Sequence, residues 1–496
     1  MTATGRRIWF CRACCEAMQT LWPDDRRLTR VFLAAVGFYF AAHWLLRSVL
    51  GGTFEMDEAE MVLLAQDFRL GYGPQPPLYN WWQALWFHLA GVNTFAVAGA
   101  KNVMIAATYV ALFMGLRVIY PVRLAVVGAL SPMLLPNFLW EAQRANTHST
   151  AMCLMMVVFL WALARVIRRG QGRDYLFLGA AFGFGLLSKY TFVLYALCLL
   201  VAALSLPRFR AAVLNRGMGL AGGVAVAIAG LPLWWMQQNP DKTLGSVRKF
   251  YLPGDSALPV WVQGAQLYAA SLVAGLLVIV VVALILRRRA KAGPALSDPV
   301  ARDFTRLMGR AFVLSSIIGA VAVLAAGVTS LQVRWLLPQF LLAAPMLMLW
   351  GAERAGPRAV RMLAGGVAIL GALALIAMAD IRLRGAGSDS LRVDQLADEI
   401  AARTTGAPLI VTDYYYAGNL RFHRPDWTYW PLSPMDQAGG REVVFIASGK
   451  VQALLAKPQL QRLAETHDIV QQGQLDIGHR FAPDQTRRIA FAILRP

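Results

Sequence analysis

Charged side chains are scarce in this chain of 496 residues and make up 15% of it, against about 25% in an ordinary soluble protein. Acidic residues are the rarer sign: 28 Asp and Glu stand against 48 Lys and Arg, which gives a formal net charge of +20. Hydrophobic residues reach 57%. The composition therefore excludes an ordinary soluble domain, and the placement of the apolar residues decides the class of protein.

Cysteine is also rare, and its five positions argue against a disulfide framework. Cys11, Cys14 and Cys15 precede the first apolar run, whereas Cys153 and Cys198 lie inside apolar runs. None lies in the segments expected outside the cytoplasm, where disulfides persist. The first three are interpreted as reduced thiols or acylation sites; no second ligand pair follows nearby to complete a metal site.

Long apolar runs recur through the first three quarters of the chain. A helix needs about 18 apolar residues to cross a bilayer. The clear runs are 31–50, 151–167, 218–236, 262–286, 311–331 and 360–379, and the weaker ones are 96–120, 124–140, 175–187, 192–206 and 335–350. Together they predict about eleven membrane-spanning helices. The first run is longer than a signal-peptide core and lacks a small-residue cleavage site, so we expect a retained anchor.

The basic residues cluster between the apolar runs. The clusters are 6–30, 165–173, 208–216, 287–310 and 354–361. If the first run exits the cytoplasm, every cluster falls on the cytoplasmic side, as the positive-inside rule requires. Such short loops between spans do not form a nucleic-acid surface, so no nucleic-acid partner is expected.

Three regions follow from this pattern. Residues 1–30 are predicted to be a cytoplasmic leader, residues 31–380 an all-α polytopic core with an outer loop at 51–95, and residues 381–496 an outer, soluble tail. In the tail, helical spacing at 391–403 and 451–466 alternates with β-type runs at 408–412, 443–447 and 488–493. This alternation predicts a small α/β domain. The absence of an internal repeat disfavours the duplicated transporter folds.

The first outer loop carries the most informative stretch, GGTFEMDEAEMVLLAQDFRLGYGPQPPLYNWWQALW at 51–86. Asp57 is expected to cap a short surface helix, with Glu60 as its capping-box partner. Tyr79, Trp82 and Trp86 then form an amphipathic stripe suited to the membrane interface. Plain helix capping explains an acidic pair here in structural terms. The alternative is catalytic, because a carboxylate at the outer surface can take the proton of an acceptor hydroxyl.

The acid pair Asp57 and Glu58, a surface helix, and then Gln75-Pro-Pro-Leu-Tyr79 resemble the GT-C membrane glycosyltransferases. The likeness is to the branch with the dolichyl-phosphate-mannose protein mannosyltransferases and the bacterial lipid A aminoarabinose transferases, and it covers roughly residues 31–350. It implies a GT-C fold, with the first acid, Asp57, in catalysis and Glu58 beside it. The aminoarabinose transferases often carry Lys before the Pro-Pro pair, where this chain has Gln75.

Further polar residues are expected on the same outer side. Lys189 and Arg334 are lone cations between apolar segments, and such residues are functional candidates by default. Similar Ser-Lys and Arg-Trp-Leu-Leu-Pro elements in the resembled family support a phosphate-binding role for both, since Arg offers a planar fork and Lys a point charge. Arg248, in a long outer loop, is a weaker candidate.

Glu141, Arg144 and His148 lie in the turn between the third and fourth predicted spans. Arg144 is expected either to pair with Glu141 or to contact substrate, and His148 either to pack or to act as a ligand. Glu141 and His148 are two positions that can share a divalent cation with Asp57, so metal and cofactor use are left open.

These residues predict an enzyme of the bacterial inner membrane whose active site faces the periplasm. A sugar would move, with inversion, from a polyprenyl-phosphate donor to an envelope acceptor such as lipid A, core oligosaccharide, another glycolipid or a protein. Asp57 would act as base, and the cations would stabilise the leaving phosphate. The alternatives are a polyprenyl-lipid flippase, which needs charges near mid-bilayer, and a non-catalytic assembly subunit.

Overall fold

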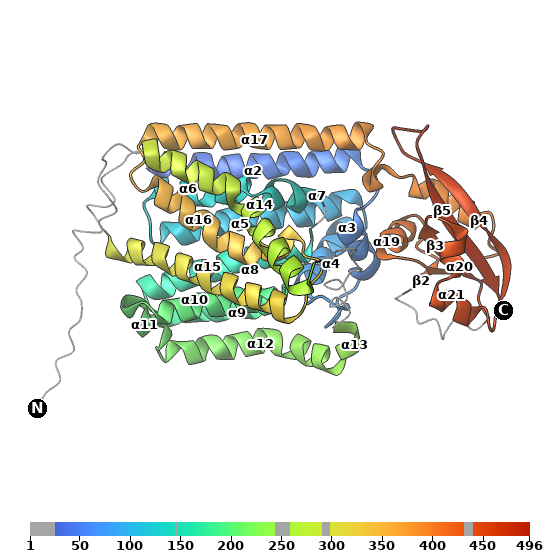
Figure 1. The fold of residues 1–496 in the computed structure, drawn as a ribbon, viewed down its shortest axis with the longest axis horizontal. Helices are drawn as coiled ribbons and strands as arrows, with labels where there is room; N and C mark the ends of the chain where they lie inside the picture. The colour runs from blue at the N-terminus through green and yellow to red at the C-terminus, as the bar shows by residue number, and fades with distance from the viewer. Residues whose placement is uncertain (1–24, 145, 244–257, 290–297, 431–439) are drawn as a thin grey trace, which may run out of the picture.

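The computed structural model of the chain describes residues 25–144, 146–243, 258–289, 298–430 and 440–496. The molecule is elongated, with a helical bundle at one end and a small sheet domain at the other, where the C-terminus lies (Figure 1). The predicted fold class, an all-α membrane core with a small C-terminal α/β domain, is confirmed.

Within the described residues, eight helices are long and apolar enough to cross a membrane. They are α2 (Asp25–Leu50), α5 (Thr94–Arg117), α8 (His148–Arg168), α12 (Gly217–Gln238), α14 (Val260–Arg289), α15 (Pro299–Ala325), η4 (Val333–Leu336) with α16 (Leu337–Ala352), and α17 (Pro357–Arg384). A ninth candidate is a bent pair, and two shorter helices are α9 (Gly172–Leu186) and α10 (Thr191–Leu204). Each of the eleven predicted runs coincides with one of these, so the multi-pass interpretation is confirmed.

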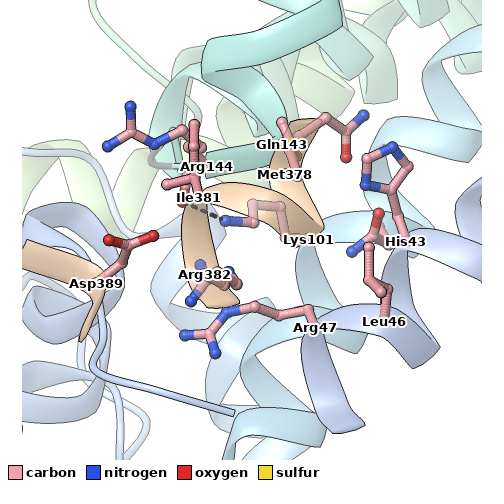
Figure 2. Close-up of a pocket in the computed structure, with 11 residues that line it drawn as sticks. His43, Leu46, Arg47, Lys101, Gln143, Arg144, Met378, Ile381, Arg382 and Asp389 are labelled. Atoms are coloured by element: carbon pink, nitrogen blue, oxygen red, sulfur yellow. Dashed lines mark hydrogen bonds between the residues drawn. The ribbon is translucent and has the colours of Figure 1, made fainter. Parts of the chain in front are cut away.

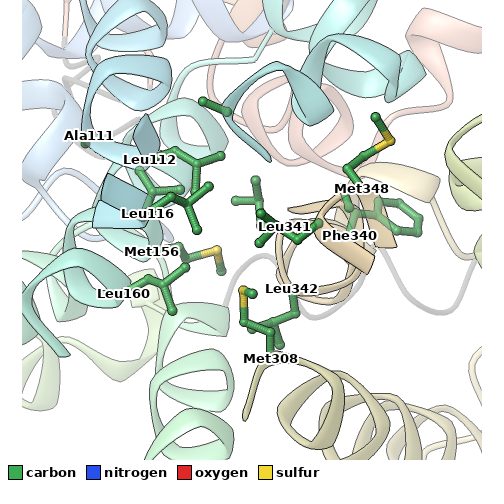
Figure 3. Packing of buried hydrophobic residues seen from close by; sticks show 14 of the residues in the cluster. Ala111, Leu112, Leu116, Met156, Leu160, Met308, Phe340, Leu341, Leu342 and Met348 are labelled. Atoms are coloured by element: carbon green, nitrogen blue, oxygen red, sulfur yellow. The ribbon is translucent and has the colours of Figure 1, made fainter. Parts of the chain in front are cut away.

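The bundle has a buried centre and a lipid-facing rim. α5, α8 and α16 are mostly buried, whereas α2, α12, α15 and α17 expose most of their surface. In the centre, Leu112 of α5 packs with Met156 of α8 and Leu341 of α16 (Figure 3). An all-round apolar helix can occupy either position, because lipid is as apolar as leucine.

The bundle has two irregular features. The bent pair turns by 77° between Val122–Leu134 and Asn137–Arg144, with Pro136 at the break. It consists of α6 (Val122–Leu130), η1 (Ser131–Leu134), η2 (Asn137–Glu141) and α7 (Ala142–Arg144). The second feature is α9, whose 15 residues rise about 22 Å, less than the roughly 30 Å thickness of the bilayer hydrocarbon.

The described parts of the basic clusters gather at the bundle end remote from the sheet domain. α11 (Pro207–Val213) lies there, and Arg208 pairs with Asp303 of α15 at 3.0 Å. Arg287 pairs with Glu353 at 3.4 Å across the ends of α14 and α16. The opposite end carries α3 (Met56–Leu64), α4 (Leu78–Ala90) and α13 (Pro240–Thr243).

The sheet domain has five strands in the order β2-β1-β3-β5-β4. They are β1 (Leu409–Val411), β2 (Thr428–Tyr429), β3 (Val443–Ser448), β4 (Asp468–Gly478) and β5 (Thr486–Arg495). β1 runs parallel to β2 and β3, whereas β5 runs antiparallel to β3 and β4. Alternate side chains point to two cores, one under α18 (Val393–Ala401) and α19 (Tyr414–His423), the other under α20 (Val451–Leu455) and α21 (Pro458–Leu463). The short η5 (Ser388–Ser390) precedes α18.

The predicted tail elements hold with one correction. The predicted helix at 451–466 is two helices, because Pro458 begins the second and cannot continue the first. β4 and α19 were not predicted. β4 has a largely exposed, polar sequence, DIVQQGQLDIG, and α19 is dominated by a tyrosine triplet that favours strands.

Candidate functional site

The acidic motif lies at the first turn of α3, at the bundle end that faces the sheet domain. The predicted cap was wrong: Glu55 is the N-cap residue, and it forms a capping box with Glu58, while Asp57 lies inside the first turn. Capping therefore does not require the Asp57 side chain, which is left to interact elsewhere.

Asp57 faces the bundle beside Arg334. Its Oδ2 lies 3.7 Å from Arg334 Nη1, and both side chains are about one-third exposed, at 28% and 30%. Arg334 also donates a hydrogen bond of 3.2 Å to Asn146 Oδ1. An accessible carboxylate next to an accessible guanidinium is suited to a reaction in which a proton is taken and a negative charge develops.

Lys189 reaches the same region from the turn between α9 and α10. Its Nζ donates to Ser149 Oγ at 2.9 Å, at the start of α8. Ser149 and Asn146 line a small pocket, partly open to the surroundings, whose lining also includes Leu337. Lys189 and Arg334 are thus joined through two residues that line one pocket.

Glu58 points away from Asp57 into the protein and is fully buried, with 1% exposure. Its carboxylate accepts from Lys101 Nζ at 2.5 Å and from Arg47 Nη2 at 3.3 Å. Burial raises the pKa of Glu58, but the charges of Lys101, Arg47 and Arg382 outweigh it and lower that pKa from 4.5 to about 2. A carboxylate this well neutralised and enclosed is suited to holding α3 in place rather than to accepting a substrate proton.

Arg144 does not form its ion pair with Glu141, as was one expectation, but with Glu55. Nη2 lies 2.9 Å from Glu55 Oε1, and Ser388 Oγ donates to Glu55 Oε2 at 3.0 Å. The cap of α3 is therefore held from the bent pair on one side and from the linker to the sheet domain on the other.

Tyr79 and His148 pack under the motif. Their ring centroids are 5.9 Å apart, and Tyr79 is fully buried, which raises the pKa of its hydroxyl and keeps it protonated. Within the described chain, neither Tyr79 Oη nor Gln75 Oε1 has a hydrogen-bond partner. Glu141 lies close enough to act on the charge of Arg144. Arg248 lies outside the described residues.

A metal centre shared by Asp57, Glu141 and His148 finds no support in this geometry. Among the residues described, no group of three or more His, Cys, Asp or Glu side chains is placed to hold an ion.

The sheet domain directly contacts the loop before α3 and α3 itself. Asn419 of α19 accepts from the Phe54 N–H at 2.8 Å and donates to the Phe54 carbonyl at 3.0 Å. Gly418 lies so close to α3 that a Cβ there would be 2.0 Å from the Ala59 carbonyl oxygen. Arg421 donates to the Leu63 carbonyl. The position of Asp57 thus depends on a helix more than 350 residues further along the chain.

Sequence reasoning missed Lys101, Arg47 and Asn146. Lys101 and Arg47 lie inside predicted spans, so the criterion that selected Lys189, a lone cation among apolar residues, applies to them equally. Asn146 carries no comparable signal, because a neutral amide near a helix start is ordinary capping material.

Comparison with known proteins places this geometry among glycosyltransferases. Residues 74–235 match the family described as dolichyl-phosphate-mannose-protein mannosyltransferase. The chain is 33% identical over 419 residues to the lipopolysaccharide core galacturonosyltransferase RgtA of Rhizobium johnstonii, covering 81% of this chain and 82% of that protein. It is 28% identical to RgtB of the same organism, described as the same kind of enzyme, covering 67% of each chain.

The fold is similar to that of ArnT from Cupriavidus metallidurans. The TM-score is 0.59 at 13% sequence identity for the apo crystal structure, covering 93% of this chain and 98% of that one. The crystal structure of ArnT bound to undecaprenyl phosphate matches with the same TM-score and coverage at 14% identity. At these identities the likeness concerns the fold.

Proposed function

The chain belongs to the GT-C membrane glycosyltransferase family that includes RgtA, and from that premise we propose that it transfers a sugar from a polyprenyl-phosphate donor to a lipopolysaccharide core acceptor at the periplasmic face of the inner membrane. Membership of a glycosyltransferase family favours an enzyme over the alternative of a lipid flippase. The observation that carries the donor assignment is the accessible Asp57 carboxylate, 3.7 Å from Arg334 at a pocket whose lining also binds Lys189.

The proposed reaction is a single displacement. Asp57 accepts the proton of an acceptor hydroxyl, whose oxygen attacks the anomeric carbon of the donor. The bond from that carbon to the phosphate oxygen breaks, and the polyprenyl phosphate leaves with the electron pair. Arg334 and Lys189 stabilise its charge, which is the larger catalytic contribution in most such sites. One displacement inverts the anomeric configuration.

Arg334 has a second consequence for this reaction. In the structure it neighbours Asp57, so part of its charge is directed at that carboxylate. A donor phosphate arriving at Arg334 competes for the guanidinium and leaves Asp57 a better proton acceptor. Donor binding would thereby prepare the base before the acceptor hydroxyl enters.

The sugar we propose is a hexuronic acid, because both curated relatives are galacturonosyltransferases. The test is transfer by purified protein in nanodiscs from polyprenyl-phosphate galacturonic acid and, in parallel, from polyprenyl-phosphate galactose, with mass spectrometry of the core glycolipid. We expect the acidic sugar to be transferred. Equal or faster transfer of the neutral sugar contradicts the uronic acid, and no transfer from either contradicts the donor class.

Replacing either proposed phosphate cation should impair use of the donor. We expect Lys189→Ala and Arg334→Ala each to weaken donor binding or turnover roughly ten- to a hundredfold, because one charge-assisted contact contributes about 1.5–3 kcal/mol. Lys242→Ala, on an exposed lysine of α13, is the matched control and should be silent. Normal donor kinetics in both test variants would mean that the phosphate binds elsewhere.

The orientation of the protein in the membrane is proposed from the positions of its basic residues. The described parts of the basic clusters gather at one end of the bundle, and α3, which carries Asp57, and the sheet domain lie at the other. Reporter fusions after residues 170 and 290 should therefore read cytoplasmic, and a fusion at the C-terminus periplasmic. A cytoplasmic C-terminus would put the sheet domain, and the loop it clamps, on the wrong side for this proposal.

A further inference from the structure

A second cavity lies behind α3, on the side of Glu58 rather than of Asp57. It spans about 480 Å³ of empty space between α2, α5, α7 and α17, and this volume includes a part that is open to the surroundings (Figure 2). Four cations line it: Arg47, Lys101, Arg144 and Arg382. We call it the cationic cleft. None of its residues belongs to the proposed donor site.

The charges around the cleft are not all paired. Its four cations are accompanied by four acids: Glu58 and Glu55 are in ion pairs, Asp389 is buried in the lining, and Glu141 acts on the charge of Arg144. Among the described residues, Arg382 forms no ion pair and donates instead to the Gly51 carbonyl. An anionic group would give this cation a charged partner.

Buried polar atoms in the cleft also lack partners within the described residues. They include donors, namely Arg47 Nε and Gln143 Nε2, and acceptors, namely Gln143 Oε1 and Asn102 Oδ1. The three residues are more than nine-tenths buried, at 8%, 8% and 4% exposure. A group with both acidic oxygens and hydroxyls satisfies such a mixed set, whereas a bare anion satisfies only the donors.

The cleft is placed where a lipid can reach it. α2 and α17 form its outer wall, and both are peripheral helices with largely exposed apolar surface. Val49 of α2 is 80% exposed and Ile376 of α17 is 65% exposed. Within the cleft, Leu46, Met378 and Ile381 add apolar contacts beside the charged groups. An occupant can therefore keep its chains in the bilayer and its headgroup in the cleft.

From Arg382 without an ion pair, the unpartnered atoms and the lipid-facing wall, we propose that the cationic cleft binds the acidic sugar headgroup, phosphorylated or carboxylated, of the acceptor glycolipid. This inference rests on the proposed function and names how that function selects its acceptor. Glu58 pairs with Lys101 and Arg47, which line the cleft, whereas Asp57, the position before it, lies beside Arg334. In this proposal α3 therefore separates the acceptor anion from the donor phosphate and places the base between them.

The test measures binding and turnover separately. Gln143→Leu and Arg382→Gln each remove a polar group that lines the cleft. Among the described residues, neither group forms a hydrogen bond with Asp57 or Glu58. We expect each to raise the acceptor KM about tenfold, the effect of losing one charge-assisted or buried hydrogen bond, with kcat and donor KM unchanged. Gln143→Leu should also raise the melting temperature without acceptor, because it removes buried unpaired atoms. Arg384→Gln, on a side chain that is 82% exposed, is the matched control.

Binding is followed by native mass spectrometry with three probes: a phosphorylated core glycolipid, the same glycolipid after dephosphorylation, and phosphatidylglycerol. The proposal expects selective retention of an acidic glycolipid, weakened in both cleft variants and kept in Lys189→Ala. Equal retention of phosphatidylglycerol would mean that the cleft binds bulk membrane lipid. No retention of any probe would mean that it does not bind an acidic glycolipid. Either outcome contradicts the proposal. Turnover with intact donor reports on the proposed function itself, so the two can fail independently.

Discussion

Asp57→Asn is expected to reduce sugar transfer by about 10²–10⁴, which is the usual contribution of general-base assistance. The substitution removes the proton-accepting charge and keeps the size of the side chain. Since Glu55, not Asp57, caps α3, the helix loses only a favourable charge in its first turn, worth about 0.3–1 kcal/mol. Donor binding should survive, because the lost interaction belongs mainly to the transition state.

The measurement is turnover from purified polyprenyl-phosphate donor in nanodiscs, together with donor affinity and a thermal-shift assay of folding. Glu60→Gln is the matched control, because it neutralises a carboxylate on the same helix one turn further on. A fully active Asp57→Asn protein with unchanged folding would disprove the assignment and direct attention to Glu141, the other candidate acid at this end of the bundle.

The fold was largely predictable because membrane spans are encoded locally. Each apolar run long enough to cross the bilayer became a helix or, at 124–140, a bent pair, and the described parts of the basic clusters lie at one end of the bundle. The details that failed are those decided by contacts. α19 forms from a tyrosine triplet because Gly418 and Asn419 pack on α3, a partner too distant in sequence for any local pattern to indicate.

The site was predictable in part for the same reason. Asp57 and Arg334 lie 277 positions apart in sequence. Asp57 was selected from the acidic loop motif and Arg334 as a lone cation between apolar segments, and the structure brings them within 3.7 Å. The distinct surroundings of Asp57 and Glu58 were not predictable. Neighbouring residues on a helix point about 100° apart, and only the packing of α5 and α2 determines which one is buried.

Glu58→Gln is expected to destabilise the protein. It leaves Lys101, which is 2% exposed, without its counter-charge, and breaking one partner of a buried ion pair costs about 3–5 kcal/mol. The lowered pKa of Glu58 gives the same conclusion by pH. The contribution of ionised Glu58 to the free energy of unfolding is complete above its ordinary pKa of 4.5 and is lost as the pH falls toward about 2. The melting temperature of the wild-type protein should therefore fall in that pH window, and that of Glu58→Gln should fall less.

A double variant separates a structural role from a catalytic one. Glu58→Leu combined with Lys101→Met replaces the Glu58–Lys101 pair by apolar side chains, a change that is often neutral or stabilising in buried ion pairs, and leaves Arg47 as the one cation of the group without its carboxylate. We expect it to recover much of the melting temperature lost in Glu58→Gln and to recover transfer activity with it, as long as Arg47 keeps its bonds to the Thr53 and Gly51 carbonyls. A double variant that folds normally and transfers no sugar would instead place Glu58 in the chemistry, and the base would then be shared by both acids of the motif.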